Sequence, residues 1–169
     1  MNFDHFIAQM ATNAETIQQL AKGVSDEQAR WKPNAESWSI VEVINHLYDE
    51  EHLDFRTRLD HILHKPGVDP PQIDPDGWVT VRTYNKRQLD QSVNNFLQER
   101  KKSLTWLRGL DSPDWEAAYF TPRFSICAGD MFAAWVVHDL LHIRQLTELH
   151  YMWTAKHLHP YSVKYAGTW

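Results

Sequence analysis

The stretch WSIVEVINHL, residues 38–47, decides the fold because it marks where a long helix begins. Ser39 and Glu42 have the spacing of a capping box, in which each side chain accepts a hydrogen bond from the other residue's backbone N–H. Apolar residues follow at helical intervals, and the proline and glycine at 66–67 predict an end just before them. We therefore expect a helix over residues 39–65.

Three further segments have the apolar spacing of helices. Residues 3–21 alternate apolar steps of four and three, which predicts an amphipathic helix. Residues 89–107 predict another that ends at Gly109, with the stem of Arg100 lying along its apolar face. Residues 128–153 are apolar on two sides, which is typical of a largely buried helix.

The connecting segments lack a helical or strand period. A connector is expected from Gly23 through Asn34, and an extended one with a short strand or turn over residues 110–127. Residues 66–83 contain four prolines and two glycines and predict a long insert, either a binding loop or lid or a surface excursion. Trp78 within this insert is a candidate pocket wall.

Length and composition favour one globular domain over residues 1–169. The chain is 43% apolar and 23% charged, which is ordinary for a folded protein. Four helices with one long crossover and no repeats predict an all-α, four-helix bundle. The one cysteine, Cys127, excludes an intrachain disulfide and a multi-cysteine metal site.

Charge and hydropathy argue against nucleic-acid binding and against a membrane protein. The net charge is −5 and no run of lysine and arginine occurs, so we do not expect nucleic-acid binding. The first residues do not resemble a signal peptide, and no stretch has membrane-spanning length. We expect a cytoplasmic protein without a membrane anchor.

Two histidines on the helix predicted over residues 128–153 are placed for shared chemistry. His138 and His142 are four residues apart, so both imidazoles leave the same face of the helix. That face also carries Met131 and Trp135, which makes them candidate pocket residues. A shared metal ion would offset the cost of burying two unpaired imidazoles.

A third imidazole can join this pair. His46 lies at the margin of the apolar face of the helix over residues 39–65 and can reach inward. Two imidazoles from one helix and one from a facing helix leave metal coordination positions open for water or substrate, as in reactive sites. Nearby residues in helical phase could orient an imidazole or relay a proton: Asp49, Glu50, Asp139 and Gln145.

Two other interpretations use the same residues. A His-x-x-x-His pair arises easily by chance in a chain with ten histidines, so ordinary burial is an alternative. The segment His138-Asp139-Leu140-Leu141-His142 has zinc-protease spacing, but aspartate replaces the glutamate base. Gln145 replaces the glycine of the longer protease motif, so we do not expect a protease.

The stretch 38–47, Gly129-Asp130, the pair His138 and His142, and the following Gln145 together resemble the DinB-like superfamily. The resemblance covers nearly the whole chain in helix order. It implies a four-helix bundle, commonly dimeric, and it assigns the family's metal-binding positions to His46, His138 and His142. Arg144 departs from the pattern, because the family often has glycine there.

The resemblance also implies an activity. Relatives include metal-dependent transferases and isomerases that use low-molecular-weight thiols, and a bound cation would activate a thiol or water. Zinc and nickel both suit imidazole ligands. We expect a thiol-dependent, S-transferase-like homodimer that acts on a small molecule. A noncatalytic metal-binding bundle that acts in dimerisation or partner binding, and a metal-dependent hydrolase, are the alternatives.

Overall fold

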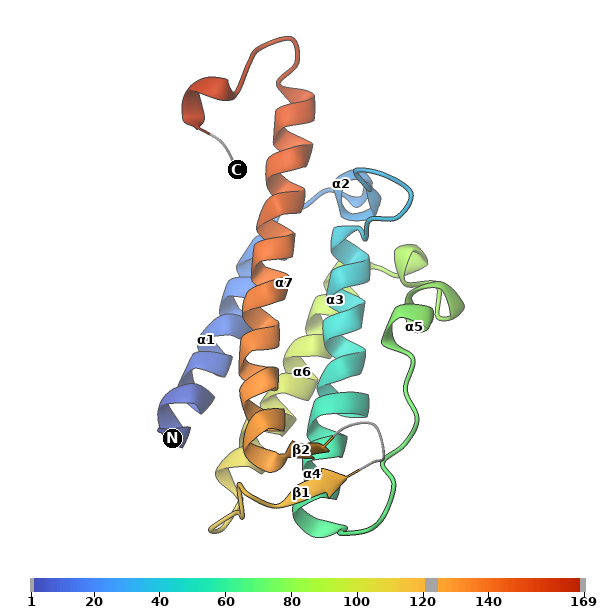
Figure 1. The fold of residues 1–169 in the computed structure, drawn as a ribbon. Coiled ribbons are helices and arrows are strands. Elements are labelled where there is room, and N and C mark those ends of the chain that lie inside the picture. Colours follow the sequence, from blue (N-terminus) through green and yellow to red (C-terminus); the bar gives the residue numbers. More distant parts are fainter. Residues whose placement is uncertain (1, 121–124, 168–169) are drawn as a thin grey trace.

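Four long helical segments form a bundle in the computed structural model, which describes residues 2–120 and 125–167 (Figure 1). They are α1 (Phe3–Ala21), a continuous run of α3 (Ile40–Asp49), η1 (Glu50–Phe55) and α4 (Arg56–His64), then α6 (Leu89–Arg108) and α7 (Ala128–His157). The helices α1 and α3 each pack against both α6 and α7. The predicted all-α four-helix bundle is confirmed.

The capping box at the start of α3 forms as predicted. The Glu42 carboxylate accepts a hydrogen bond from the Ser39 backbone N–H at 2.8 Å, and Ser39 Oγ accepts one from the Glu42 N–H at 3.4 Å. The other Glu42 oxygen lies 2.8 Å from Lys32 Nζ. The helix start is therefore fixed by buried polar contacts as well as by apolar packing.

The second long helix is wider at its centre than the sequence predicts. Residues 50–55 form the π-helical turn η1, between two α-helical parts. The Thr57 hydroxyl, at the start of α4, donates to the His52 carbonyl of this turn at 2.7 Å, which satisfies a carbonyl five residues back. Glu50 and Glu51, the first two residues of the turn, are both buried.

Two predicted connectors contain short helices, so the prediction of irregular chain there was wrong in part. The first connector holds α2 (Asp26–Arg30), and the insert holds α5 (Pro75–Val81), followed by the 3-10 turn η2 (Tyr84–Lys86). Ser25 and Asp74 cap α2 and α5. Helices this short do not produce a periodic pattern, and only their caps are visible in the sequence.

The segment before α7 contains the short strand that the sequence predicts. β1 (Ala118–Phe120) pairs antiparallel with β2 (Ser125–Cys127). Helix α7 continues beyond the expected end at residue 153, and the tail after it holds the 3-10 turn η3 (Lys164–Ala166). Among the described residues, no helix combines the length and apolarity that crossing a bilayer requires.

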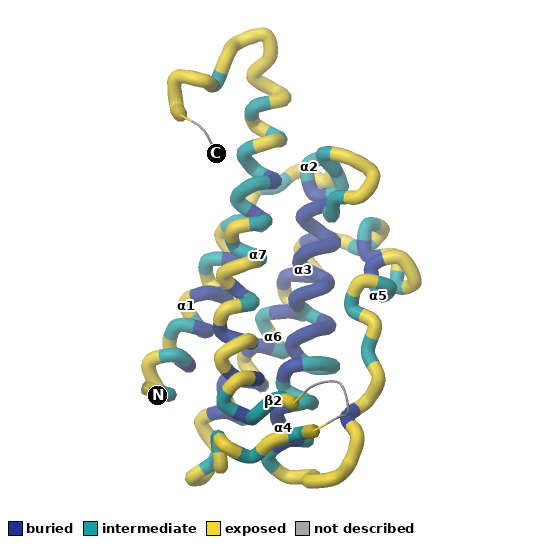
Figure 2. Tube along the Cα trace, in the orientation of Figure 1, coloured by how far each residue is buried: buried dark blue, intermediate teal, exposed yellow. Residues whose placement is uncertain are grey.

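The expectation that α7 is buried on two sides was wrong for its outer face. Val137, Leu140 and Leu141 have exposed fractions of 51%, 43% and 49%. Figure 2 shows the same alternation of buried and exposed residues along α7. Of the apolar side expected opposite the histidines, Val136 is buried, Ile143 is half-buried and Leu140 is exposed, so the described residues cover this side only in part.

The bundle core consists of two apolar clusters, one toward each end. The first surrounds Ile44, Phe96 and Leu146, and the second surrounds Phe132 and Trp135. Between them along α1, α6 and α7 lie buried polar residues, including Asn13, Arg100 and Asp139. This polar layer, defined by those three residues with Glu51, crosses the bundle.

Arg100 is the centre of the polar layer and is 2% exposed. Its guanidinium donates to both oxygens of Glu51 at 2.7 and 2.9 Å and to both oxygens of Asp139 at 2.7 Å. It also donates to the Met10 carbonyl at 3.0 Å. Burial alone would lower the pKa of Arg100, but the two carboxylates outweigh burial and raise it. The predicted placement of its stem along an apolar face was therefore incomplete, because the charged end is buried too.

Because Arg100 is paired in the polar layer and Lys102 is on the surface, we expect their substitution to change the free energy of unfolding by very different amounts. Arg100→Met leaves two buried carboxyl groups without a cation, which should lower the free energy of unfolding by about 3–5 kcal/mol. Lys102 is 64% exposed and pairs with Glu99 on the surface, so Lys102→Met should cost less than about 1 kcal/mol. Urea unfolding followed by circular dichroism measures both, and equal costs would contradict the role of the layer.

Candidate metal centre

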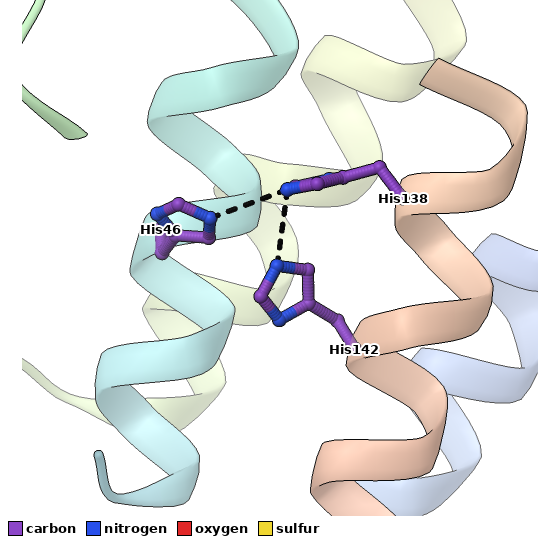
Figure 3. Close-up of side chains that lie close together, drawn as sticks. All are labelled: His46, His138 and His142. Carbon is purple, nitrogen blue, oxygen red and sulfur yellow. Dashed lines mark hydrogen bonds between the residues drawn. The ribbon is translucent and has the colours of Figure 1, made fainter. Parts of the chain in front are cut away.

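The three predicted histidines come together at one point between α3 and α7 (Figure 3). His138 Nε2 lies 3.4 Å from His46 Nε2 and 3.0 Å from His142 Nε2. The ligand atoms of the three residues all lie within 4.8 Å of one another. His138 and His142 are one turn apart on α7, and His46 faces them from α3, as the helical phase predicts.

This spacing fits a metal ion. Zinc–nitrogen bonds of 2.0–2.1 Å with tetrahedral angles place neighbouring ligand nitrogens about 3.3 Å apart. The Nε2 of His138 lies 3.4 Å from that of His46 and 3.0 Å from that of His142. These two pairs are close to the separation of ligands that share one cation, and the ligand atoms of all three residues lie within 4.8 Å of one another.

Burial keeps the imidazoles in the form that binds metals. It lowers the pKa of His46 to about 3, with a further contribution from His142. Burial also lowers the pKa of His138 and of His142. At neutral pH the three rings are uncharged in the absence of a metal, and a neutral imidazole nitrogen carries the lone pair that coordinates a cation.

Neighbouring side chains contact each of the three rings. His142 Nδ1 donates to Gln145 Oε1 at 2.8 Å, which leaves the proton off Nε2 and turns it toward the other histidines. The Trp38 ring lies 4.8 Å from His46, centre to centre, and Phe55 lies 4.9 Å from His138. Of the sequence candidates for orienting an imidazole, Gln145 is the one placed to do so.

Glu50 borders the centre without bonding to it. Its Oε2 lies 3.6 Å from His138 Nε2, which is longer than a hydrogen bond, and its Oε1 is buried and without a hydrogen-bond partner among the described residues. Burial, and next the charge of Asp54, raise the pKa of Glu50 to about 8, although Arg58 opposes this. In the metal-free protein at neutral pH, Glu50 is mainly protonated, so its contact with His138 is not an ion pair.

Two other candidates have different contacts. Asp49 accepts a hydrogen bond from the Tyr84 hydroxyl and pairs with Arg82 at 2.7 Å, so it fastens the end of the insert to α3. Asp139 belongs to the polar layer through Arg100. Neither carboxylate makes a hydrogen bond to the three imidazoles, so the expected direct orienting role was wrong for both.

The candidate pocket residues also lie elsewhere. Met131 and Trp135 are core residues, 8% and 1% exposed, and the Trp135 indole donates to Glu51 at 3.0 Å. Trp78 is half-buried beneath the guanidinium of Arg82, 4.2 Å from its ring centre. None of the three lines the cavity that opens onto the histidines. Their placement on an apolar stripe or in the insert was insufficient to predict a pocket.

A cavity of about 440 Å³ opens onto His142. Its walls come from the loop before α3, from α5 and from the C-terminal half of α7. Its lining consists of Pro33, Glu36, Ser37, Trp38, Asp76, His142, Gln145, Glu148, Leu149 and Met152. The sequence predicted Gln145 beside the centre but missed Asp76, because its proximity depends on how the insert folds back.

The fold is similar to that of a solved protein, YfiT. YfiT from Bacillus subtilis, described as a probable metal-dependent hydrolase with an unusual four-helix bundle topology, superposes with a TM-score of 0.79. The match covers 90% of this chain and 87% of YfiT at 18% sequence identity, and it establishes the shared fold. No curated protein matches the sequence significantly.

Most of the sequence also matches the model of a protein family. Residues 9–146 match the model described as the DinB superfamily. The matched range includes His46, His138 and His142, and it runs from residue 9 within α1 to residue 146 within α7. The chain belongs to the DinB superfamily.

Proposed function

We propose that the protein is a metal-dependent hydrolase in which His46, His138 and His142 hold a divalent cation and water is the nucleophile. The convergence of three uncharged imidazoles on one point carries this proposal. The fold shared with YfiT, itself described as a probable metal-dependent hydrolase, supports it. Zinc and nickel both suit an all-imidazole set.

The proposed chemistry needs an open coordination position and a proton acceptor. A divalent cation held by three imidazoles leaves such a position and lowers the pKa of a water or thiol bound there. Glu50 is placed to accept the released proton, because one of its oxygens is 3.6 Å from His138 Nε2 and the other has no hydrogen-bond partner among the described residues. A nearby positive charge would also lower the pKa of Glu50 and so ionise it for this task.

Other residues of the chain hold the centre in place. Gln145 fixes the ring of His142 through its Nδ1 proton. Trp38 and Phe55 pack against His46 and His138 and exclude bulk water from their rings. A centre that is closed on these sides and open toward the cavity at His142 admits a substrate from one direction.

A thiol-dependent transferase is the second candidate. The cavity of about 440 Å³ beside His142 has room for the small cosubstrate that this reaction requires. A cation held by the same three imidazoles would then favour the thiolate form of a low-molecular-weight thiol. The two candidates share the metal site and differ only in the nucleophile.

The metal assignment predicts a selective loss on mutation. His138→Ala should lose most of its bound zinc or nickel while keeping helical circular dichroism, because two ligands remain from a set of three. His64 lies on α4 and its ring pairs with Asp60, so His64→Ala should keep the metal. Elemental analysis after loading and desalting measures the content, and a metal content unchanged in His138→Ala would refute the site.

The nucleophile can be identified by turnover. Zinc-loaded protein is expected to hydrolyse small esters or amides without added thiol and to stop when a chelator is present. Turnover only with a thiol, and with formation of the thiol adduct, would instead establish the transferase. A chelator that lowers the melting temperature, with no turnover under either condition, would favour a noncatalytic metal-binding bundle.

Because burial raises the pKa of Glu50, we expect the stability of the metal-free protein to depend on pH. Burial raises the pKa of Glu50 to about 8 in the folded state, from its ordinary value of 4.5. Its stabilising contribution is therefore complete below pH 4.5 and is lost as the pH rises toward 8. Glu50→Gln should lose less stability than the parent protein between pH 5 and 8 in urea unfolding. Parallel pH profiles in the two proteins would contradict this.

A further inference from the structure

The cavity beside His142 has an acidic lining. Three carboxylate side chains line it, and neither lysine nor arginine does so among the described residues. Glu36 comes from the loop before α3, Asp76 from α5, and Glu148 from α7. Segments that are distant in sequence therefore bring the same charge to one opening.

Basic residues on the neighbouring segments do not neutralise this charge. Lys32, near Glu36 in sequence, is paired with the buried Glu42 at 2.8 Å. Arg82, at the end of α5, is paired with Asp49 at 2.7 Å. Within the described part of the chain, none of the three cavity carboxylates forms an ion pair. A positive ligand would meet no competing cation of the protein there.

A second observation places an unsatisfied acidic group farther in. Glu50 is 5% exposed, and its Oε1 has no hydrogen-bond partner within the described residues. Its other oxygen, Oε2, lies 3.6 Å from Nε2 of His138, and the neighbouring His142 lines the cavity. An unpaired buried oxygen is costly and indicates that a further partner belongs there.

The remaining walls suit an apolar body. Trp38 lies parallel to the His142 ring, with an interplanar angle of 4° and ring centres 6.4 Å apart. Leu149 and Met152 complete the apolar side of the cavity. A tryptophan face attracts organic cations, and methionine adapts to ligands of varied shape.

We propose that this cavity selects organic cations, namely small molecules in which an ammonium group is attached to an apolar body. The ammonium group would lie among Glu36, Asp76 and Glu148, and the body would pack on Trp38 and beside His142. The substrate class rests on the proposed function, because the bond to be cleaved would face the three histidines. Negatively charged cosubstrates, including carboxylate-bearing thiols, would be disfavoured at this opening.

Binding to the metal-free protein tests this selection with three probes of similar size: 2-phenylethylammonium, 2-phenylethanol and phenylacetate. Isothermal titration calorimetry at low salt should show the ammonium binding at least about 10-fold more tightly than the alcohol, with phenylacetate the weakest. The advantage of the ammonium should shrink at about 0.5 M salt, because the cavity mouth is open to solvent.

Charge-neutralising variants provide the matched comparison. The double variant Glu36→Gln and Glu148→Gln should weaken ammonium binding about 10-fold and leave the alcohol unchanged. Glu116 is exposed beside the β1–β2 hairpin, so Glu116→Gln removes one charge far from the cavity and should have no effect. Equal affinity for cation and alcohol, no effect of the double variant, or no binding of any probe would overturn the proposal.

The outcomes separate this inference from the proposed reaction. Selective ammonium binding without metal-dependent turnover would retain the cavity assignment and reject the hydrolase. Metal-dependent turnover that does not prefer cationic substrates, and that is unaffected by the double variant, would retain the hydrolase and reject the selection.

Discussion

The buried guanidinium of Arg100 connects all four sides of the bundle. It bonds to Glu51 of η1, to Asp139 of α7 and to the Met10 carbonyl of α1, and it comes itself from α6. Apolar helices can slide past one another at modest cost, but a slide here would leave a buried charge without its partner. Two of its partners adjoin the metal centre in sequence, Glu51 next to Glu50 and Asp139 next to His138. The contact that aligns the helices therefore also aligns the site.

The polar layer and the three histidines lie between the two apolar clusters of the core. Burial is unfavourable for each polar group taken alone, because desolvation disfavours every charged form. The layer offsets this cost through complete pairing around Arg100. At the histidines the cost is only partly offset, since Glu50 Oε1 and His46 Nδ1 have no partner among the described residues. The groups around Arg100 are hydrogen-bonded, whereas buried polar atoms beside the histidines lack partners among the described residues. This difference is the physical reason to place the chemistry at the histidines.

Much of this arrangement could be predicted from local patterns. The capping box at Ser39, the apolar spacing of the long helices and the four-residue interval between His138 and His142 predicted the bundle and the converging imidazoles. These features depend on neighbours within one or two turns. Features that depend on contacts across the fold could not be predicted in this way: the π turn, the complete burial of Arg100, and the approach of Asp76 to the cavity. Trp135 illustrates how far such patterns can be used: an apolar stripe predicts that a residue points inward, but it does not distinguish a core residue from a pocket residue.

The insert after α4 is attached to the bundle through residues that also belong to the site region. Asp49, one residue before Glu50, holds both Arg82 and the Tyr84 hydroxyl.

The π turn at residues 50–55 has an evolutionary consequence. Loss of a single residue there would restore α-helical spacing and leave the helices on either side nearly in phase, so the change would fall on the residues of the turn itself. Glu50 could then no longer lie beside His138 of α7 while Glu51 bonds to Arg100 of α6. A length change of one residue in this turn should therefore be tolerated far less than substitutions in it, and related chains that keep both carboxylates should also keep the extra residue.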